Sequence, residues 1–213
     1  ADVPDGASVM IGGFGNAGMP AKLIDCLIAQ GAKDLTVVNN NAGNADAGLA
    51  ALIGAGRVRK ILCSFPRQTD SWHFDKLYRA GKLELELVPQ GTLAERIRAA
   101  GAGIGGFFTP TAFGTRLAEG KETRHINGRD YVLEYPIHAD YALIKADRAD
   151  RWGNLTYRKT ARNFAPIMAA AARCTIVQVR ETVALGALDP ETVVTPGIYV
   201  KRVVVSESVK LRH

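Results

Sequence analysis

The chain has 213 residues, of which 47% are hydrophobic and 23% are charged, a balance that excludes disordered, collagen-like and coiled-coil proteins. It contains no apolar run near the ~20 residues that a membrane-spanning helix needs, so we expect no membrane span and no membrane partner. The net charge of +6, carried mostly by residues 108–213, suits an anionic small ligand better than nucleic acid, because no basic helix stripe or aromatic-interleaved strand accompanies it.

The first half of the chain alternates short apolar runs with amphipathic segments. The predicted strands are 8–12, 35–38, 58–65 and 83–88, and the predicted helices are 21–30, 47–53, 70–79 and 92–100. Pro20 and Gly31 bound the first helix, and Asp70 is a candidate cap for the third. Four strand–helix units in a row predict an α/β fold, an open and mostly parallel doubly wound sheet.

The second half is richer in strands. The dipeptide Asn127-Gly128 is typical of a hairpin turn. Further strands are predicted at 131–135, 141–144, 155–157, 175–179 and 199–205, with one helix at 167–172. Since no internal repeat and no flexible linker interrupts the chain, we predict one domain over residues 1–213 with a small β-rich insertion near 108–140.

Three widely spaced cysteines, Cys26, Cys63 and Cys174, argue against a disulfide framework and against a zinc site. Each lies in an apolar stretch, so we expect buried thiols and a reducing, cytoplasmic environment. The first residues carry no signal-peptide pattern. Because Ala1 stands where an initiator Met would, we expect a truncated or processed N-terminus.

A glycine loop follows the first predicted strand and precedes the first helix. It matches G-x-G-x-x-G, and its candidate binding residues are Gly13, Phe14, Gly15, Asn16 and Gly18. Backbone N–H groups and the helix dipole at such a turn favour an anion. The acidic residue that would bind the ribose of NAD is missing after the second strand, so we interpret the loop as facing an anion or a carbonyl. The structural alternative is a tight strand-to-helix turn.

Amide side chains follow the second and fourth strands. Asn39 and Asn40 begin an Asn-rich loop, and Gln90 follows the fourth strand. Ligands of open α/β sheets bind at these strand ends, and amides can orient a carboxylate or a thioester carbonyl. An Asn-rich turn is the structural alternative. Thr92 and Glu95 form the pattern T-x-x-E, which predicts a capping box at the start of the next helix.

Two further segments are candidate binding elements. The second glycine loop contributes Gly103, Gly105, Gly106 and Phe107, whose backbone N–H groups could converge on an oxyanion, with a flexible hinge as the alternative. The run 157–163 is the densest basic patch and could hold phosphates or a distal carboxylate, with a solvated surface as the alternative. Candidate cations for a substrate carboxylate are Arg67, His138, Arg158 and Arg162.

No residue pattern in the sequence identifies a catalytic nucleophile or base. The sequence contains no G-x-S-x-G elbow, no H-E-x-x-H and no P-loop. We therefore predict no catalytic residue and no metal site in this chain, which leaves an α/β scaffold with anion- and carbonyl-binding loops.

These loops resemble a known family. The segment 5–20, D-G-A-S-V-M-I-G-G-F-G-N-A-G-M-P, is similar to the signature of the family I coenzyme A-transferases. The resemblance continues through 39–43, 89–96, 103–107 and 158–164, and it is to the A (alpha) subunit of the two-subunit enzymes. Within the family, 70–75 and 134–140 look most like members that act on 3-oxoadipate.

The resemblance implies an enzyme that works only with a B subunit. In this family the acyl-CoA is attacked by a glutamate of a Ser-Glu-Asn-Gly motif in the B subunit, and this sequence lacks that motif. The implied reaction is ping-pong transfer of CoA from succinyl-CoA to 3-oxoadipate through a glutamyl-CoA thioester, in the β-ketoadipate pathway of aromatic degradation. The implied assembly has two A and two B subunits. CoA thioester is a substrate, and no permanent cofactor is expected.

Two other functions remain open from the sequence. One is the same chemistry on acetoacetate, acetate or short-chain fatty acids. The other is a non-catalytic nucleotide-binding module built on Gly13–Gly18, which the missing acidic residue after the second strand disfavours.

Overall fold

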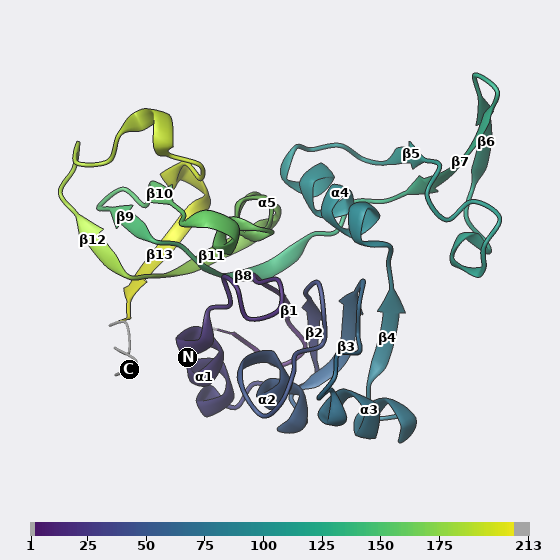
Figure 1. Ribbon diagram of the computed structural model, residues 1–213, viewed down its shortest axis with the longest axis horizontal. Coiled ribbons are helices and arrows are strands. Elements are labelled where there is room, and N and C mark those ends of the chain that lie inside the picture. Colours follow the sequence, from purple (N-terminus) through teal and green to yellow (C-terminus); the bar gives the residue numbers. More distant parts are fainter. Residues whose placement is uncertain (1–2, 207–213) are drawn as a thin grey trace.

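A wholly parallel seven-stranded sheet forms the centre of the protein, which is described by a computed structural model over residues 3–206 (Figure 1). Its strands lie in the order β13-β11-β8-β1-β2-β3-β4. Their bounds are β1 Ser8–Ile11, β2 Leu35–Val38, β3 Val58–Cys63, β4 Glu84–Leu87, β8 Ala139–Lys145, β11 Ala172–Val179 and β13 Val200–Val205. From β1 the chain winds outward in one direction through β4 and then in the other through β13, which confirms the predicted doubly wound α/β sheet.

Helices cover both faces of this sheet (Figure 1). One face carries α1 Ala21–Gln30, α2 Gly48–Gly54 and α3 Trp72–Arg79, and the other carries α4 Gln90–Gly101 and α5 Ala165–Ala171. Gly31 ends α1 in a left-handed conformation, as expected. No helix within residues 3–206 is long and apolar enough to cross a bilayer.

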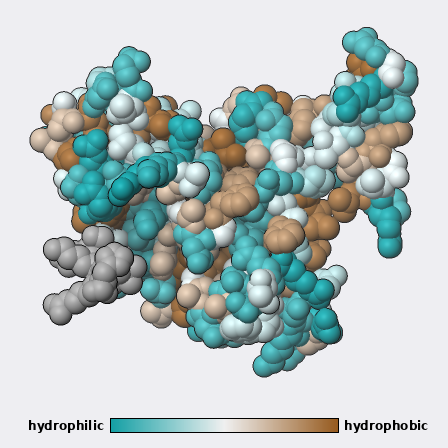
Figure 2. Space-filling model, viewed as in Figure 1, coloured by the Kyte–Doolittle hydropathy of each residue, from teal (hydrophilic) through white to brown (hydrophobic). Residues whose placement is uncertain are grey.

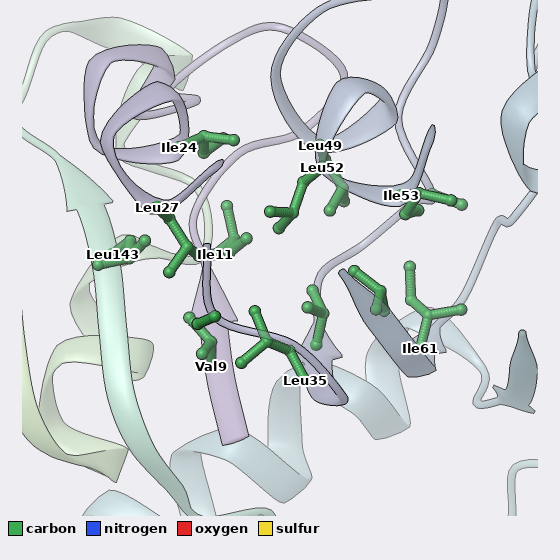
Figure 3. Close-up of a cluster of buried hydrophobic side chains, with 14 of the residues drawn as sticks. Val9, Ile11, Ile24, Leu27, Leu35, Leu49, Leu52, Ile53, Ile61 and Leu143 are labelled. Atoms are coloured by element: carbon green, nitrogen blue, oxygen red, sulfur yellow. The ribbon is translucent and has the colours of Figure 1, made fainter. Parts of the chain in front are cut away.

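The core beneath α1 and α2 shows why β1 and β2 contain consecutive apolar residues, Val9–Ile11 and Val37–Val38. Figure 3 shows Leu49, Leu52 and Ile53 of α2 directed toward the same side-chain cluster as Val9 and Ile61 of the sheet. The next residues of β1 and β2 point to the opposite face, where Met10 and Val38 meet α4 and α5. A strand that is buried on both faces has no position for a polar side chain, so its sequence lacks alternation.

The predicted β-rich insertion is a separate three-stranded antiparallel sheet, which projects from the body at the upper right of Figures 1 and 2. Its strands are β5 Phe107–Thr109, β6 Thr123–Ile126 and β7 Arg129–Glu134. Asn127 and Gly128 join β6 to β7 with positive φ at both positions, which confirms the hairpin turn. The buried Glu134 carboxylate anchors the base of the insertion, where it accepts a hydrogen bond from Lys121 Nζ at 2.6 Å.

A second small sheet and four short 3₁₀ helices complete the fold. The sheet has the order β10-β9-β12, with bounds β9 Arg148–Asp150, β10 Leu155–Thr156 and β12 Glu181–Val183. The 3₁₀ helices are η1 Arg116–Ala118, η2 Lys159–Arg162, η3 Pro190–Thr192 and η4 Gly197–Tyr199. The sequence did not predict β9 or β12, because strands of three residues carry no readable periodicity.

Both predicted helix caps are wrong. Helix α3 begins at Trp72, and Asp70 provides no cap; its backbone carbonyl instead accepts from Ala45 N at 2.9 Å. Helix α4 begins at Gln90, immediately after Pro89, so Thr92 lies inside its first turn and not before it. Within residues 3–206 the Thr92 hydroxyl is buried without a hydrogen-bond partner, and Glu95 pairs forward with Arg98.

The cysteines differ in exposure, against the expectation that all three are buried. Cys63 is buried, Cys174 is half-buried and Cys26 is exposed on α1. Burial raises the pKa of the Cys63 thiol to about 12. The prediction failed at Cys26 because this residue lies next to the apolar stripe of α1, among residues that face the core.

Replacing Thr92 by Val tests the corrected start of α4. A buried hydroxyl without a partner costs about 1–3 kcal/mol of desolvation, so removing it should leave the free energy of unfolding unchanged or raise it by about 1 kcal/mol. Urea denaturation of the two proteins measures the difference. A loss of about 1 kcal/mol would instead support the capping box.

Candidate active site

The candidate site lies where the sheet reverses its winding direction. Strands β1 and β8 are parallel neighbours, but the chain leaves them toward opposite ends of the sheet. A crevice forms outside the carboxyl ends of strands at such a point, and ligands of open α/β sheets bind there. The loops after β1, β2, β3 and β4 all emerge at this edge, because the strands are parallel.

The glycine loop after β1 is a two-residue hairpin. Phe14 N donates to Ala17 O at 3.0 Å, and Ala17 N donates back to Phe14 O at 3.2 Å. Gly15 begins the turn with a φ of +57°, and a Cβ there would meet no atom within 4 Å. The N–H groups of Gly15 and Asn16 make no hydrogen bond within residues 3–206. The tip of the loop therefore presents two donors at the crevice.

Asn163 fastens the basic segment 158–163 to this loop. Its Oδ1 accepts from Gly13 N at 3.2 Å, and its Nδ2 donates to Ala17 O at 2.8 Å. The two segments are so close that a Cβ on Gly18 would collide with the backbone oxygen of Ala161. Glycine is thus required at position 18 by space as well as by its φ of +76°.

A cavity of about 440 Å³ opens between the loops that follow β1, β2, β3 and β4. It is lined by Phe14, Gly15, Asn40, Ser64, Phe65, Gln68 and Gln90. Asn40 Oδ1 accepts two hydrogen bonds, from Gln90 Nε2 at 2.8 Å and from Ser64 Oγ at 2.7 Å. Because the acceptor end of Asn40 is used, its Nδ2 is a donor with no partner in the described part of the chain.

Asn39 does not line this cavity, which corrects its predicted role as a binding residue. Its side chain is fully buried, with Nδ2 donating to Ile11 O at 2.6 Å and Oδ1 accepting from Asn41 N at 2.9 Å. Asn39 therefore holds the loops after β1 and β2 together. The sequence gives no signal for this difference, because Asn39 and Asn40 are neighbours that point to opposite sides of the strand end.

Three residues that follow β3 also line the cavity and were not predicted from the sequence: Ser64, Phe65 and Gln68. The loop is attached to the Asn loop by its backbone, since Phe65 N donates to Asn40 O at 3.0 Å. Phe65 is 59% exposed, although large aromatic side chains are usually buried. The only available signal was position, because a loop after the third parallel strand must open at the same edge as the loops after the first two.

Further along the chain, side-chain hydrogen bonds join the loop after β2 to the start of α3. Asp46 Oδ1 lies 2.7 Å from His73 Nε2 and accepts from Trp72 Nε1 at 3.0 Å. These hydrogen bonds lower the pKa of the Asp46 carboxyl. Asp70 N also donates to Asn44 Oδ1 at 2.9 Å. His73 is thus a structural partner at the start of α3.

The basic segment lines two further cavities beside the glycine loop. The larger, about 940 Å³, is lined by Phe14, Ala17, Tyr157, Lys159, Thr160, Arg162, Asn163 and Val194. The smaller, about 360 Å³, shares four of these residues and adds Arg158, Lys145 and Arg180. Phe14 lines both the larger cavity and the amide-lined one, so these two spaces are neighbours.

Two other predicted site residues, Arg67 and His138, are not among the residues that line these three cavities. Arg67 is paired with Asp75 of α3. His138 immediately precedes β8 and is therefore at the amino edge of the sheet; a seven-residue strand, about 23 Å long, separates it from the crevice. His138 thus lies away from the crevice in this chain, and its role as a carboxylate-binding residue stays a prediction.

The second glycine loop is also apart from the first. Gly103, Gly105 and Gly106 follow the last turn of α4, whereas Gln90 begins that helix, and twelve helical residues span about 18 Å. Phe107 begins β5 at the base of the insertion. The structure therefore does not bring these residues to the amide-lined cavity, and an oxyanion role for them would require a site shared with another chain.

A metal centre has no candidate among residues 3–206, where no group of three His, Cys, Asp or Glu side chains could hold an ion. The amide-lined cavity likewise contains no carboxylate, thiol or imidazole, and its one hydroxyl, Ser64 Oγ, donates to Asn40. This arrangement can orient a carbonyl or carboxylate by donating hydrogen bonds. It has no group of its own to attack one.

Sheet order, crevice and donor-lined cavity define an α/β protein with a cavity lined by amide donors at the carboxyl edge of its sheet. Comparison with known proteins identifies its family, because residues 1–206 match the model of the coenzyme A transferases and the chain belongs to that family.

Two bacterial relatives and one solved structure are similar along nearly the whole chain. The A subunit of the 3-oxoadipate CoA-transferase of Pseudomonas putida is 69% identical over 95% of this chain and 87% of its own, and that of Acinetobacter baylyi is 66% identical over 97% and 90%. The glutaconate coenzyme A-transferase of Acidaminococcus fermentans shares the fold, with a TM-score of 0.83 and 22% identity over 96% of this chain and 72% of its own.

Alanine substitutions at Gly18 and Gly15 form a matched pair that tests how the basic segment is held. Both glycines have a positive φ, so each substitution carries a similar backbone cost of about 1 kcal/mol. Only Gly18→Ala also collides with Ala161. We expect Gly18→Ala to lower the free energy of unfolding by at least about 1–2 kcal/mol more than Gly15→Ala in urea denaturation. Equal losses would contradict the packing described.

Proposed function

We propose that this chain is the A subunit of a CoA-transferase that moves CoA from succinyl-CoA to 3-oxoadipate, together with a B subunit that carries the nucleophilic glutamate. The observation that carries the proposal is the amide-lined cavity, which has donors for a carbonyl oxygen and no nucleophile. The substrate pair is supported by the identity to relatives that are named as A subunits of 3-oxoadipate CoA-transferase.

The donors around the cavity are suited to an acyl carbonyl that gains negative charge. Asn40 Nδ2 and the N–H groups of Gly15 and Asn16 are unused within the described chain. Helix α4 begins at Gln90, so its first N–H groups and its positive dipole end lie at the same edge. Fixed donors of this kind stabilise a tetrahedral oxyanion more than the neutral thioester, and that difference lowers the barrier.

Because this chain places no nucleophile in the cavity, the nucleophile must come from the partner chain. A glutamate carboxylate of the partner attacks the succinyl carbonyl, which forms a mixed anhydride and releases CoA thiolate. The thiolate attacks the glutamyl carbonyl, so succinate leaves and a glutamyl-CoA thioester remains. The carboxylate of 3-oxoadipate attacks that thioester and releases the thiolate again. Attack of the thiolate on the 3-oxoadipyl carbonyl gives 3-oxoadipyl-CoA and restores the glutamate.

In this scheme Asn40 and Gln90 orient whichever carbonyl is under attack. The two amides are linked to each other and to Ser64, so neither can turn without breaking a hydrogen bond at 2.7–2.8 Å. Orientation of this kind converts binding energy into correct alignment of the reacting atoms. Phe14 and Phe65, each more than half exposed, supply apolar walls that exclude water from the anhydride.

Co-expression with a B subunit that contains the Ser-Glu-Asn-Gly motif tests the proposal. We expect formation of 3-oxoadipyl-CoA from succinyl-CoA by the pair, none by either chain alone, and a higher kcat/KM for 3-oxoadipate than for acetoacetate. Removing the amide by Gln90→Ala should lower kcat/KM by roughly 10- to 100-fold, because Asn40 loses the hydrogen bond that holds its free Nδ2 in position for the developing charge.

Lys82→Ala is the control variant for that experiment. Lys82 is exposed between α3 and β4 at the amino edge of the sheet, away from the cavity, so this variant should retain wild-type kinetics. Preference for acetoacetate would overturn the substrate, and a stable complex that is inactive with every acceptor would overturn the proposed function.

A further inference from the structure

The basic segment 158–163 carries positive charges that are not paired with acidic side chains. Arg158, Lys159 and Arg162 are exposed, and none of them has an ion-pair partner within residues 3–206. Lys145, at the end of β8, adds a fourth exposed cation to the smaller cavity. Four cations without ion-pair partners in the described chain therefore gather around two adjoining cavities.

The acidic residue in these cavities does not neutralise the cluster. Asp147 is held by Arg180, whose Nε lies 3.0 Å from Asp147 Oδ1. Tyr157, whose hydroxyl lies 2.7 Å from Thr195 Oγ1, forms part of the wall between the cavities. Burial raises the pKa of Tyr157 to about 12, so the ring stays neutral and adds no negative charge.

The backbone that carries the cations is held firmly in an uncommon conformation. Lys159 has a φ of +51° and Asn163 a φ of +22°, values that cost a non-glycine residue of order 1–3 kcal/mol each. The four hydrogen bonds of the Asn163 amide, to Gly13, Ala17, Thr160 and Phe164, maintain this conformation. The segment is therefore fixed relative to the glycine loop, and so are the points from which its cations extend.

We propose that this segment binds the phosphate-bearing end of coenzyme A, with Arg162 and Lys159 as the principal contacts. The inference rests on the proposed function and extends it, because it assigns the two ends of one substrate to two neighbouring cavities. The acyl end lies among Asn40 and Gln90, and the phosphates lie on the cations. Phe14, which lines both cavities and is 52% exposed, is the apolar surface between them.

Charge and size favour phosphates over the distal carboxylate of the acceptor. A carboxylate carries one negative charge and is satisfied by a single Arg fork, whereas coenzyme A carries a diphosphate and a 3′-phosphate. The larger cavity, at about 940 Å³, is near the upper end of the range for ligand pockets and has room for more than a short carboxylic acid. The extended pantetheine arm also accounts for the separation, since it must cross Phe14 between the thioester and the phosphates.

Charge removal at Arg162 and Lys159 tests the inference in the co-expressed complex of the two chains. Calorimetry would measure the dissociation constants of CoA and of pantetheine, which lacks every phosphate. We expect Arg162→Gln and Lys159→Gln each to weaken CoA binding by about tenfold or more and to leave pantetheine binding within twofold. In both variants the KM for succinyl-CoA should rise along with the dissociation constant of CoA. The KM for 3-oxoadipate should stay within twofold of the wild-type value.

Arg79→Gln is the matched control. Arg79 is also exposed and has no ion-pair partner in the described chain, but it ends α3 at the amino edge of the sheet. The Arg79→Gln variant should bind CoA like the wild type. Equal elution volumes and melting temperatures of the complexes would exclude misfolding of the variants.

Two outcomes would overturn the inference. If CoA binding is unchanged and the KM for 3-oxoadipate rises, the cations bind the carboxylate of the acceptor. If neither quantity changes, the segment is a solvated surface. Because binding is measured directly, the inference is decided even if the complex transfers CoA to no acceptor, and that failure would count against the proposed function alone.

Discussion

Parallel pairing is the constraint on which the site depends. Since β1, β2, β3 and β4 all run in the same direction, the loops that follow them must open at one edge, whatever their sequences. Residues far apart in the chain, such as Phe14, Asn40, Ser64 and Gln90, thereby line one cavity. The hydrogen bond between Gln90 Nε2 and Asn40 Oδ1, across 50 residues of sequence, is a direct result of this pairing.

A single amide extends the site beyond the sheet edge. Asn163 connects the basic segment to the glycine loop through Gly13 N and Ala17 O, and Gly18 permits the close approach because it has no Cβ. The amide-lined and cationic cavities are therefore neighbouring parts of one surface, and Phe14 lines both of them. The division of labour follows from chemistry, because neutral amides suit a carbonyl that gains charge only transiently, and guanidinium and ammonium groups suit permanent anions.

Much of this arrangement is readable from the sequence, and the failures have physical causes. Apolar runs and glycine stops predicted the strands and helices of the first half, because a strand buried on both faces must be apolar throughout. Adjacent asparagines could not be told apart, since Asn39 and Asn40 differ only in the side of the strand end to which they point. The position of His138 at the opposite edge could not be predicted, because strand direction, which determines the edge it occupies, is a property of the assembled sheet. Ser64 and Phe65 carry no motif, and their role comes from the strand that precedes them.

Locating the covalent intermediate would test directly which chain carries the nucleophile. The complex of this chain with its partner chain would be mixed with succinyl-CoA in the absence of acceptor, quenched, and both chains weighed by mass spectrometry. We predict a CoA adduct, bound as a thioester, on the partner chain and none on this one. An adduct on this chain, or one that forms on this chain without the partner, would contradict the claim that it supplies the cavity and not the nucleophile.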